Sequence, residues 1–133
     1  MLYRSWKRYG YGITKMMTLI CGHSRAGKTT FSKRYDNVIH FDDVRSRSKV
    51  IEKVTEADGD IVVEGIYYAP EHRAELCNAY DGFTRCIFID TPDEIRAKRM
   101  GRKILHPYPF LQPTYDEGWD EIIIIRGGED EKC

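Results

Sequence analysis

The sequence predicts an α/β fold: a single domain built on a five-stranded, mostly parallel sheet with helices on both faces. Two observations lead to this prediction. Short apolar runs that end at glycine or polar residues alternate with segments whose apolar residues have helical spacing. The phosphate-binding pattern GxxxxGK[ST] begins directly after the first of these runs. Buried strands that alternate with helices are typical of a parallel sheet covered on both sides.

The expected strands are the apolar runs at 18–21, 38–41, 61–63, 85–89 and 122–125. The expected helices lie between them, at 28–35, 44–57 and 70–79. A further helix is expected after Thr91, because Thr91 suits an N-cap, Pro92 suits the first helical position and Glu94 completes a capping box. Prolines interrupt residues 101–118, which we therefore expect to form an irregular loop.

Length and composition indicate one globular domain. The chain has 133 residues, of which 41% are apolar and 32% are charged. We assign residues 16–127 to the domain, 1–15 to a loose basic and aromatic arm, and 128–133 to an acidic tail. No apolar run approaches the roughly 20 residues of a membrane span, and no secretory leader is visible, so we expect a cytoplasmic protein without membrane contacts.

Charge and cysteine content argue against a zinc-binding protein and against a general nucleic-acid coat protein. None of the four cysteines forms a CxxC pair, so a zinc site of the usual spacing is not expected. The net charge is zero, which argues against a protein that coats nucleic acid in general. It does not exclude a local basic site for an anionic substrate.

The sequence leaves the oligomeric state open.

The phosphate-binding pattern is the most specific signal in the chain. Glycines let successive backbone N–H groups point inward, where they and a helix N-terminus hold phosphates. Lys28 is expected to contact the β- and γ-phosphates of a nucleotide, and the Thr29 hydroxyl is expected to bind Mg²⁺. The expected nucleotide-binding residues are Gly22, His23, Ser24, Arg25, Ala26, Gly27, Lys28, Thr29 and Thr30.

Polar residues that suit the acceptor side follow the second and third expected strands. In a parallel sheet, the carboxyl ends of these strands lie at the same edge as the phosphate loop. Asp42 is placed to accept a proton from a hydroxyl, and Arg45 to hold an acceptor phosphate, whereas Asp43 fits a helix cap. Glu64 fits equally a magnesium site, through water, or a contact with the phosphate-loop backbone. Asp42 is a second candidate for such a water-mediated magnesium contact.

Arginines precede the proline-containing loop. Spacing of three places Arg96, Arg99 and Arg102 on one stripe of a helix. We interpret Arg96 and Lys98 as solvated. Arg99 and Arg102 suit a lid whose closure brings positive charge to the transferred phosphoryl group.

Together these pieces resemble the P-loop polynucleotide kinases, which transfer the ATP γ-phosphate to a 5′-hydroxyl of DNA or RNA. The resemblance covers about residues 17–126. It rests on the segments GHSRAGKTTF, DDVR, VVEGIYYAPEHR, DTPDEIRAKRMGR and PTYDEGWDEI.

The resemblance implies a role for each matching residue. It implies that Lys28 and Thr29 contact phosphate and magnesium, that Asp42 is the general base, and that Arg45 contacts the phosphate 3′ to the accepting nucleoside. Arg102 matches the lid arginine, and Arg99 a second one. The segment between DDVR and the third strand is short, so a kinase of a nucleoside, nucleotide or other small metabolite stays open, as does a nucleotide-binding module without transfer activity.

Overall fold

The computed structural model describes residues 15–23, 25–101 and 110–127. Residues 1–14 of the predicted N-terminal arm, the acidic tail, Ser24 and Arg102 lie outside these described residues. Over the described part of the chain, no helix is long and apolar enough to cross a membrane.

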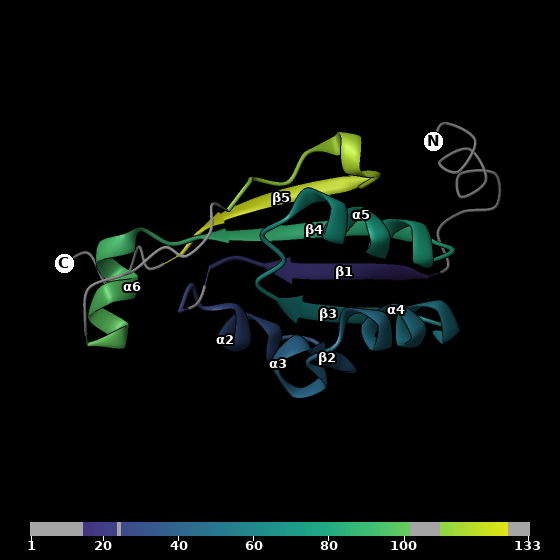
Figure 1. Cartoon of the computed structure of the whole chain (residues 1–133), viewed down its shortest axis with the longest axis horizontal. Helices are drawn as coiled ribbons and strands as arrows, with labels where there is room; N and C mark the ends of the chain where they lie inside the picture. Colours follow the sequence, from purple (N-terminus) through teal and green to yellow (C-terminus); the bar gives the residue numbers. More distant parts are fainter. Residues whose placement is uncertain (1–14, 24, 102–109, 128–133) are drawn as a thin grey trace.

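The central sheet has five strands, all parallel, in the order β2-β3-β1-β4-β5. The strand that precedes the phosphate loop is therefore in the middle. The arrows in Figure 1 accordingly end at one common edge, beyond which α6 lies. The predicted α/β fold with a five-stranded sheet is confirmed. The strands are β1 (Met16–Cys21), β2 (Val38–His40), β3 (Ile61–Gly65), β4 (Phe83–Asp90) and β5 (Glu121–Arg126).

Helices follow each of the first four strands. The segment predicted at 70–79 agrees with α5, and the one predicted at 28–35 ends earlier, at Ser32. Part of the loop predicted at 101–118 forms a short 3-10 helix, η1, capped by Thr114 and Glu117. The helices are α2 (Lys28–Ser32), α3 (Phe41–Val44), α4 (Arg47–Glu56), α5 (Pro70–Ala79), α6 (Asp93–Met100) and η1 (Tyr115–Glu117).

The helix predicted at 44–57 is present as α4, but it begins three residues later than expected, at Arg47. Helix α3 begins at Phe41, which was expected to end the strand, and it stops before Arg45. Arg45 has a left-handed backbone with φ +57°. The Ser46 side chain then accepts a hydrogen bond from the Lys49 N–H at 3.3 Å and starts α4. A left-handed residue followed by a serine N-cap is a strong helix break.

The core lies on both faces of the sheet. On one face, Leu19 of β1 packs with Val54 of α4 and Leu76 of α5 in one buried cluster. On the other face, Ile20 of β1 belongs to a second cluster, and Phe31 of α2 packs against it. Successive side chains of a strand point to opposite faces, so both faces of β1 are buried. This burial fixes the central strand and the loop that follows it.

Candidate active site

The phosphate loop has the backbone that its glycines predict. Gly27 has φ +105°, a left-handed conformation that a side chain disfavours. Gly22 is constrained by space as well, because a Cβ there would lie 2.7 Å from the Ile89 carbonyl oxygen. The loop thus approaches the end of β4 closely and opens into α2 at Lys28.

Lys28 is buried at the mouth of this loop. Its exposed fraction is 8%, and its Nζ donates to the His23 carbonyl oxygen at 2.7 Å. Burial lowers the pKa of Lys28 below its ordinary 10.5, while the negative charges of Glu64 and Asp42 oppose that change. A cation held this way can turn to an incoming phosphate without leaving the loop.

A cavity of about 850 Å³ opens over the phosphate loop. This volume suits a nucleotide-sized ligand. Asp42 borders it from α3, directly after β2, Glu64 borders it from the end of β3, and Arg99 borders it from α6. The cavity therefore joins phosphate-binding groups, carboxylates and an arginine. Its lining also includes Arg25, Ala26, Gly27, Lys28, Thr29, Thr30, Phe31, Arg34, Ile66, Ile125 and Gly127.

The acceptor-side residues divide into two groups. Asp42 is exposed and borders the cavity, whereas exposed Asp43 does not belong to the cavity wall. Arg45 is exposed too, and its Nε donates to the Asp42 carbonyl oxygen at 3.0 Å. Its left-handed backbone places it beside Asp42 without making it part of the cavity wall.

Glu64 is paired with a residue that the sequence did not single out as functional. His40 of β2 lies opposite Glu64 of β3 in the sheet register. The His40 Nδ1 is 2.6 Å from Glu64 Oε1. Only the alignment of the two strands brings these residues together, and no local sequence pattern indicates it.

Arg99 of α6 reaches the phosphate loop, and Arg96 of the same helix is buried. Arg99 Nη1 donates to the Arg25 carbonyl oxygen at 2.8 Å, which agrees with its predicted place over the loop. The prediction that Arg96 is solvated was wrong, because only 3% of it is exposed and its charge acts on the pKa of Lys28. Lys98 is exposed, as expected. Arg96 pairs with Asp93, three residues before it, but such a pair is common on exposed helix faces and does not indicate burial.

Thr91 has a different task from the one predicted. Pro92, and not Thr91, precedes the first residue of α6. The Thr91 hydroxyl instead donates to the Ala26 carbonyl oxygen at 2.7 Å, and both residues are buried. This bond ties the end of β4 to the phosphate loop.

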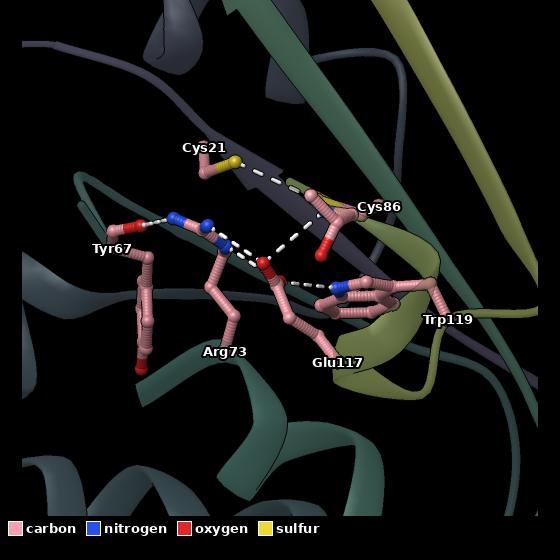
Figure 2. A network of polar contacts seen from close by, with 7 residues as sticks. Cys21, Tyr67, Arg73, Cys86, Glu117 and Trp119 are labelled. Carbon is pink, nitrogen blue, oxygen red and sulfur yellow. Dashed lines mark hydrogen bonds and ion pairs between the residues drawn. The ribbon is translucent and has the colours of Figure 1, made fainter. Parts of the chain in front are cut away.

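A buried polar network supports the turn after β3. Tyr67 has a left-handed backbone with φ +44°, and its carbonyl accepts from Arg73 Nη1 at 2.7 Å. Figure 2 shows the Arg73 guanidinium between this carbonyl and the Glu117 carboxylate, with Cys21 nearby at the end of β1. The strained turn is therefore held from α5 and η1.

The residues at the cavity fit a magnesium nucleotide. Mg²⁺ prefers oxygen ligands and binds nucleotides through few protein groups. The Thr29 side chain and the carboxylates of Asp42 and Glu64 supply such oxygens at the cavity wall. Lys28 and Arg99 supply the positive charge that phosphates require.

Solved structures of similar shape support this view of the fold. A candidate kinase from Chloroflexus aurantiacus j-10-fl aligns with a TM-score of 0.63 at 10% identity, over 90% of this chain and 92% of that one. The protein APE1195 aligns with a TM-score of 0.56 at 14% identity, over 83% of this chain and 84% of that one. A sugar kinase from Janibacter sp. HTCC2649 aligns with a TM-score of 0.56 at 15% identity, over 85% of each chain.

The chain shares its fold with these three solved structures, two of which are named as kinases. No family model matches the sequence, and no curated protein matches it. The assignment of the fold therefore rests on the sheet order and on these three structures. At identities of 10–15%, the likeness extends to the fold alone.

Proposed function

We propose that the protein is an ATP-dependent kinase that transfers the γ-phosphoryl group to a hydroxyl acceptor. One observation carries this proposal: a buried lysine of a phosphate loop, a carboxylate suited to act as base and an arginine border the same cavity. A module that only binds nucleotides has no need of a base beside the phosphates. The kinase names of the neighbouring structures agree with the proposal.

In the proposed reaction, Asp42 accepts the proton of the acceptor hydroxyl while that oxygen forms a bond to the γ-phosphorus. The bond between the γ-phosphorus and the β,γ-bridging oxygen breaks, and ADP leaves. Lys28 and Arg99 stabilise the charge on the transferred group. Thr29 would hold Mg²⁺, with Asp42 or Glu64 contributing through water, and this ion would neutralise phosphate charge.

For the acceptor, we propose the 5′-hydroxyl end of a polynucleotide. The DDVR segment supports this choice, because Arg45 is exposed beside Asp42 and free to meet a phosphate outside the cavity. A phosphate 3′ to the accepting nucleoside would lie on that outer side. The cavity itself would hold the nucleotide and the acceptor hydroxyl that is phosphorylated.

A small acceptor is the second candidate. Arg45 does not belong to the cavity wall, so that wall lacks the residue that would distinguish a polynucleotide from a free sugar or nucleoside. One of the neighbouring structures is named a sugar kinase. A compact hydroxyl compound would need only Asp42, Lys28 and Arg99.

The test is an acceptor panel with γ-labelled ATP and Mg²⁺. The acceptors are a 5′-hydroxyl oligonucleotide, a nucleoside 3′-monophosphate, a free nucleoside and a set of sugars. Label on the first two compounds alone supports the polynucleotide kinase. Label on a nucleoside or sugar alone supports the small-acceptor kinase, and no label on any compound contradicts both. The Lys28→Ala protein is the control for a contaminating kinase.

A further inference from the structure

His40 and Glu64 form a cross-strand pair beside the phosphate loop. They are direct partners in the parallel register of β2 and β3, and Glu64 is also the partner of Ile20 in β1. Both residues lie at the carboxyl edge of the sheet, where parallel α/β folds bind their ligands. Their position is therefore set by backbone hydrogen bonds of three strands.

The contact between them is short and polar. His40 Nδ1 and Glu64 Oε1 are 2.6 Å apart. An ionised carboxylate only accepts hydrogen bonds, so the hydrogen belongs to Nδ1 of His40 when Glu64 carries its charge. Hydrogen bonds to charged groups are shorter and stronger than neutral ones. The contact therefore fixes the direction of the Glu64 carboxylate.

Glu64 depends on this contact. Only 7% of its side chain is exposed, while 33% of the His40 side chain is exposed. Within residues 15–23, 25–101 and 110–127, His40 is the one hydrogen-bond partner of the Glu64 carboxylate. A buried carboxylate without a partner is strongly disfavoured. Without His40, the Glu64 carboxylate would be free to rotate away from its present direction.

The oriented carboxylate acts on the site. Glu64 borders the cavity and is the charge that most opposes the lowering of the Lys28 pKa. Asp42 also borders the cavity, but it is exposed. Glu64 is thus the acid whose direction the fold fixes, and His40 is the residue that fixes it.

We propose that His40 is a positioning residue of the phosphotransfer site, which holds the Glu64 carboxylate toward Lys28 and the magnesium nucleotide. An effect of His40 on catalytic turnover would depend on the proposed kinase function. An effect of His40 on ATP binding can be measured without any acceptor. His40 itself touches neither nucleotide nor acceptor in this role, and it acts only through Glu64.

A double-mutant cycle tests the proposal. The variants are His40→Ala, Glu64→Gln and the combination, and the first readout is the affinity for ATP by calorimetry with and without Mg²⁺. We expect each of the three variants to bind ATP about tenfold more weakly with Mg²⁺, as is usual when the partner of a metal-site residue is removed. Without Mg²⁺ we expect no weakening, because a fixed negative charge does not favour free ATP.

Conservative and matched variants complete the design. His40→Asn keeps a donor near the position of Nδ1 and should recover most of the Mg²⁺-dependent affinity. His72→Ala is the control, because His72 lies on α5 against Tyr68 and not at the cavity. It should bind ATP as the unchanged protein does. Thermal melting of every variant identifies any that are not folded.

Three results would overturn the proposal. The first is additive losses from His40→Ala and Glu64→Gln, which would show that His40 acts without Glu64. The second is equal weakening with and without Mg²⁺, which would indicate a general distortion of the phosphate loop. The third is a His40→Ala protein with unchanged affinity. If the binding cycle agrees but no acceptor is phosphorylated, the positioning role holds and the kinase function fails.

Discussion

Arg73 and Glu117 form a buried two-point ion pair between α5 and η1. Arg73 Nε lies 2.8 Å from Glu117 Oε1, and Nη2 lies 2.9 Å from Oε2 (Figure 2). Arg73 has no exposed surface, and the exposed fraction of Glu117 is 8%. The Trp119 Nε1–H also donates to Glu117 Oε1, at 3.0 Å. The segment before β5 is thus fixed to α5 by charge as well as by packing.

We predict that breaking this pair lowers stability sharply. Arg73→Met would leave the Glu117 carboxylate buried without its cation, at a cost of about 3–5 kcal/mol in the free energy of unfolding. Urea denaturation measures this loss. Arg47→Ala is the matched control, because it breaks an exposed pair with Glu75 and should cost at most about 1 kcal/mol. Equal losses from both variants would contradict a special role for the buried pair.

We predict that Asp42→Asn abolishes phosphoryl transfer and retains ATP binding, because the amide cannot accept the acceptor proton. Turnover of the best acceptor and ATP affinity by calorimetry are the two measurements. Asp43→Asn is the control: it is the adjacent acid, exposed and not part of the cavity wall, and should keep normal turnover. An Asp42→Asn enzyme with near-normal turnover would exclude Asp42 as the base.

We predict that Arg99→Gln lowers kcat on the order of a hundredfold, because it removes a cation beside the transferred phosphoryl group. The bond from Arg99 Nη1 to the Arg25 carbonyl oxygen, at 2.8 Å, already holds this side chain against the loop. Steady-state kinetics give the answer. Lys98→Gln changes an exposed charge of the same helix and should leave kcat unchanged. Similar losses in the two variants would point to the overall charge of α6 instead.

We predict that Thr91→Val destabilises the protein by about 1–3 kcal/mol, because the buried Ala26 carbonyl loses its donor. The phosphate loop would also be held less tightly, so the KM for ATP should rise. Thr91→Ser keeps the hydroxyl and should restore both values. If the valine variant matches the unchanged protein in melting temperature and KM, the 2.7 Å bond has no such role.

We predict a loss of stability at alkaline pH that depends on Tyr80. Burial, together with Asp60 and Asp81, raises the pKa of Tyr80 from 10.0 to about 12. Because the folded pKa is the higher one, Tyr80 stabilises the fold below about pH 10, and this contribution is lost as the pH rises toward about 12.

The measurement is the urea midpoint between about pH 9 and about pH 11. Tyr80→Phe loses the hydrogen bond to the Gly59 carbonyl oxygen and should be less stable at neutral pH, but its stability should fall less with rising pH. Identical pH slopes for the two proteins would show that Tyr80 does not titrate in the expected direction. Burial raises the pKa of Tyr67 as well, so part of the slope should persist.

The sequence alone determined the parts of the fold that are coded locally. Apolar runs between polar or glycine residues predicted all five strands, and Pro70 marked the start of α5. The phosphate loop was equally visible, because its glycines, Lys28 and Thr29 are neighbours in the chain. Asp42 and Glu64 could be placed at the cavity from a single rule, that the carboxyl ends of parallel strands share one edge.

The tertiary structure alone decided the pairings that complete the site. His40 and Glu64 are 24 residues apart, Arg73 and Glu117 are 44 apart, and Thr91 and Ala26 are 65 apart. Such pairs depend on the register of strands and the seating of helices, which no local pattern encodes. The burial of Arg96 belongs to the same group, because α6 acquires a buried side only through tertiary packing. Spacing along a chain fixes which residues share a face, but packing decides what that face meets.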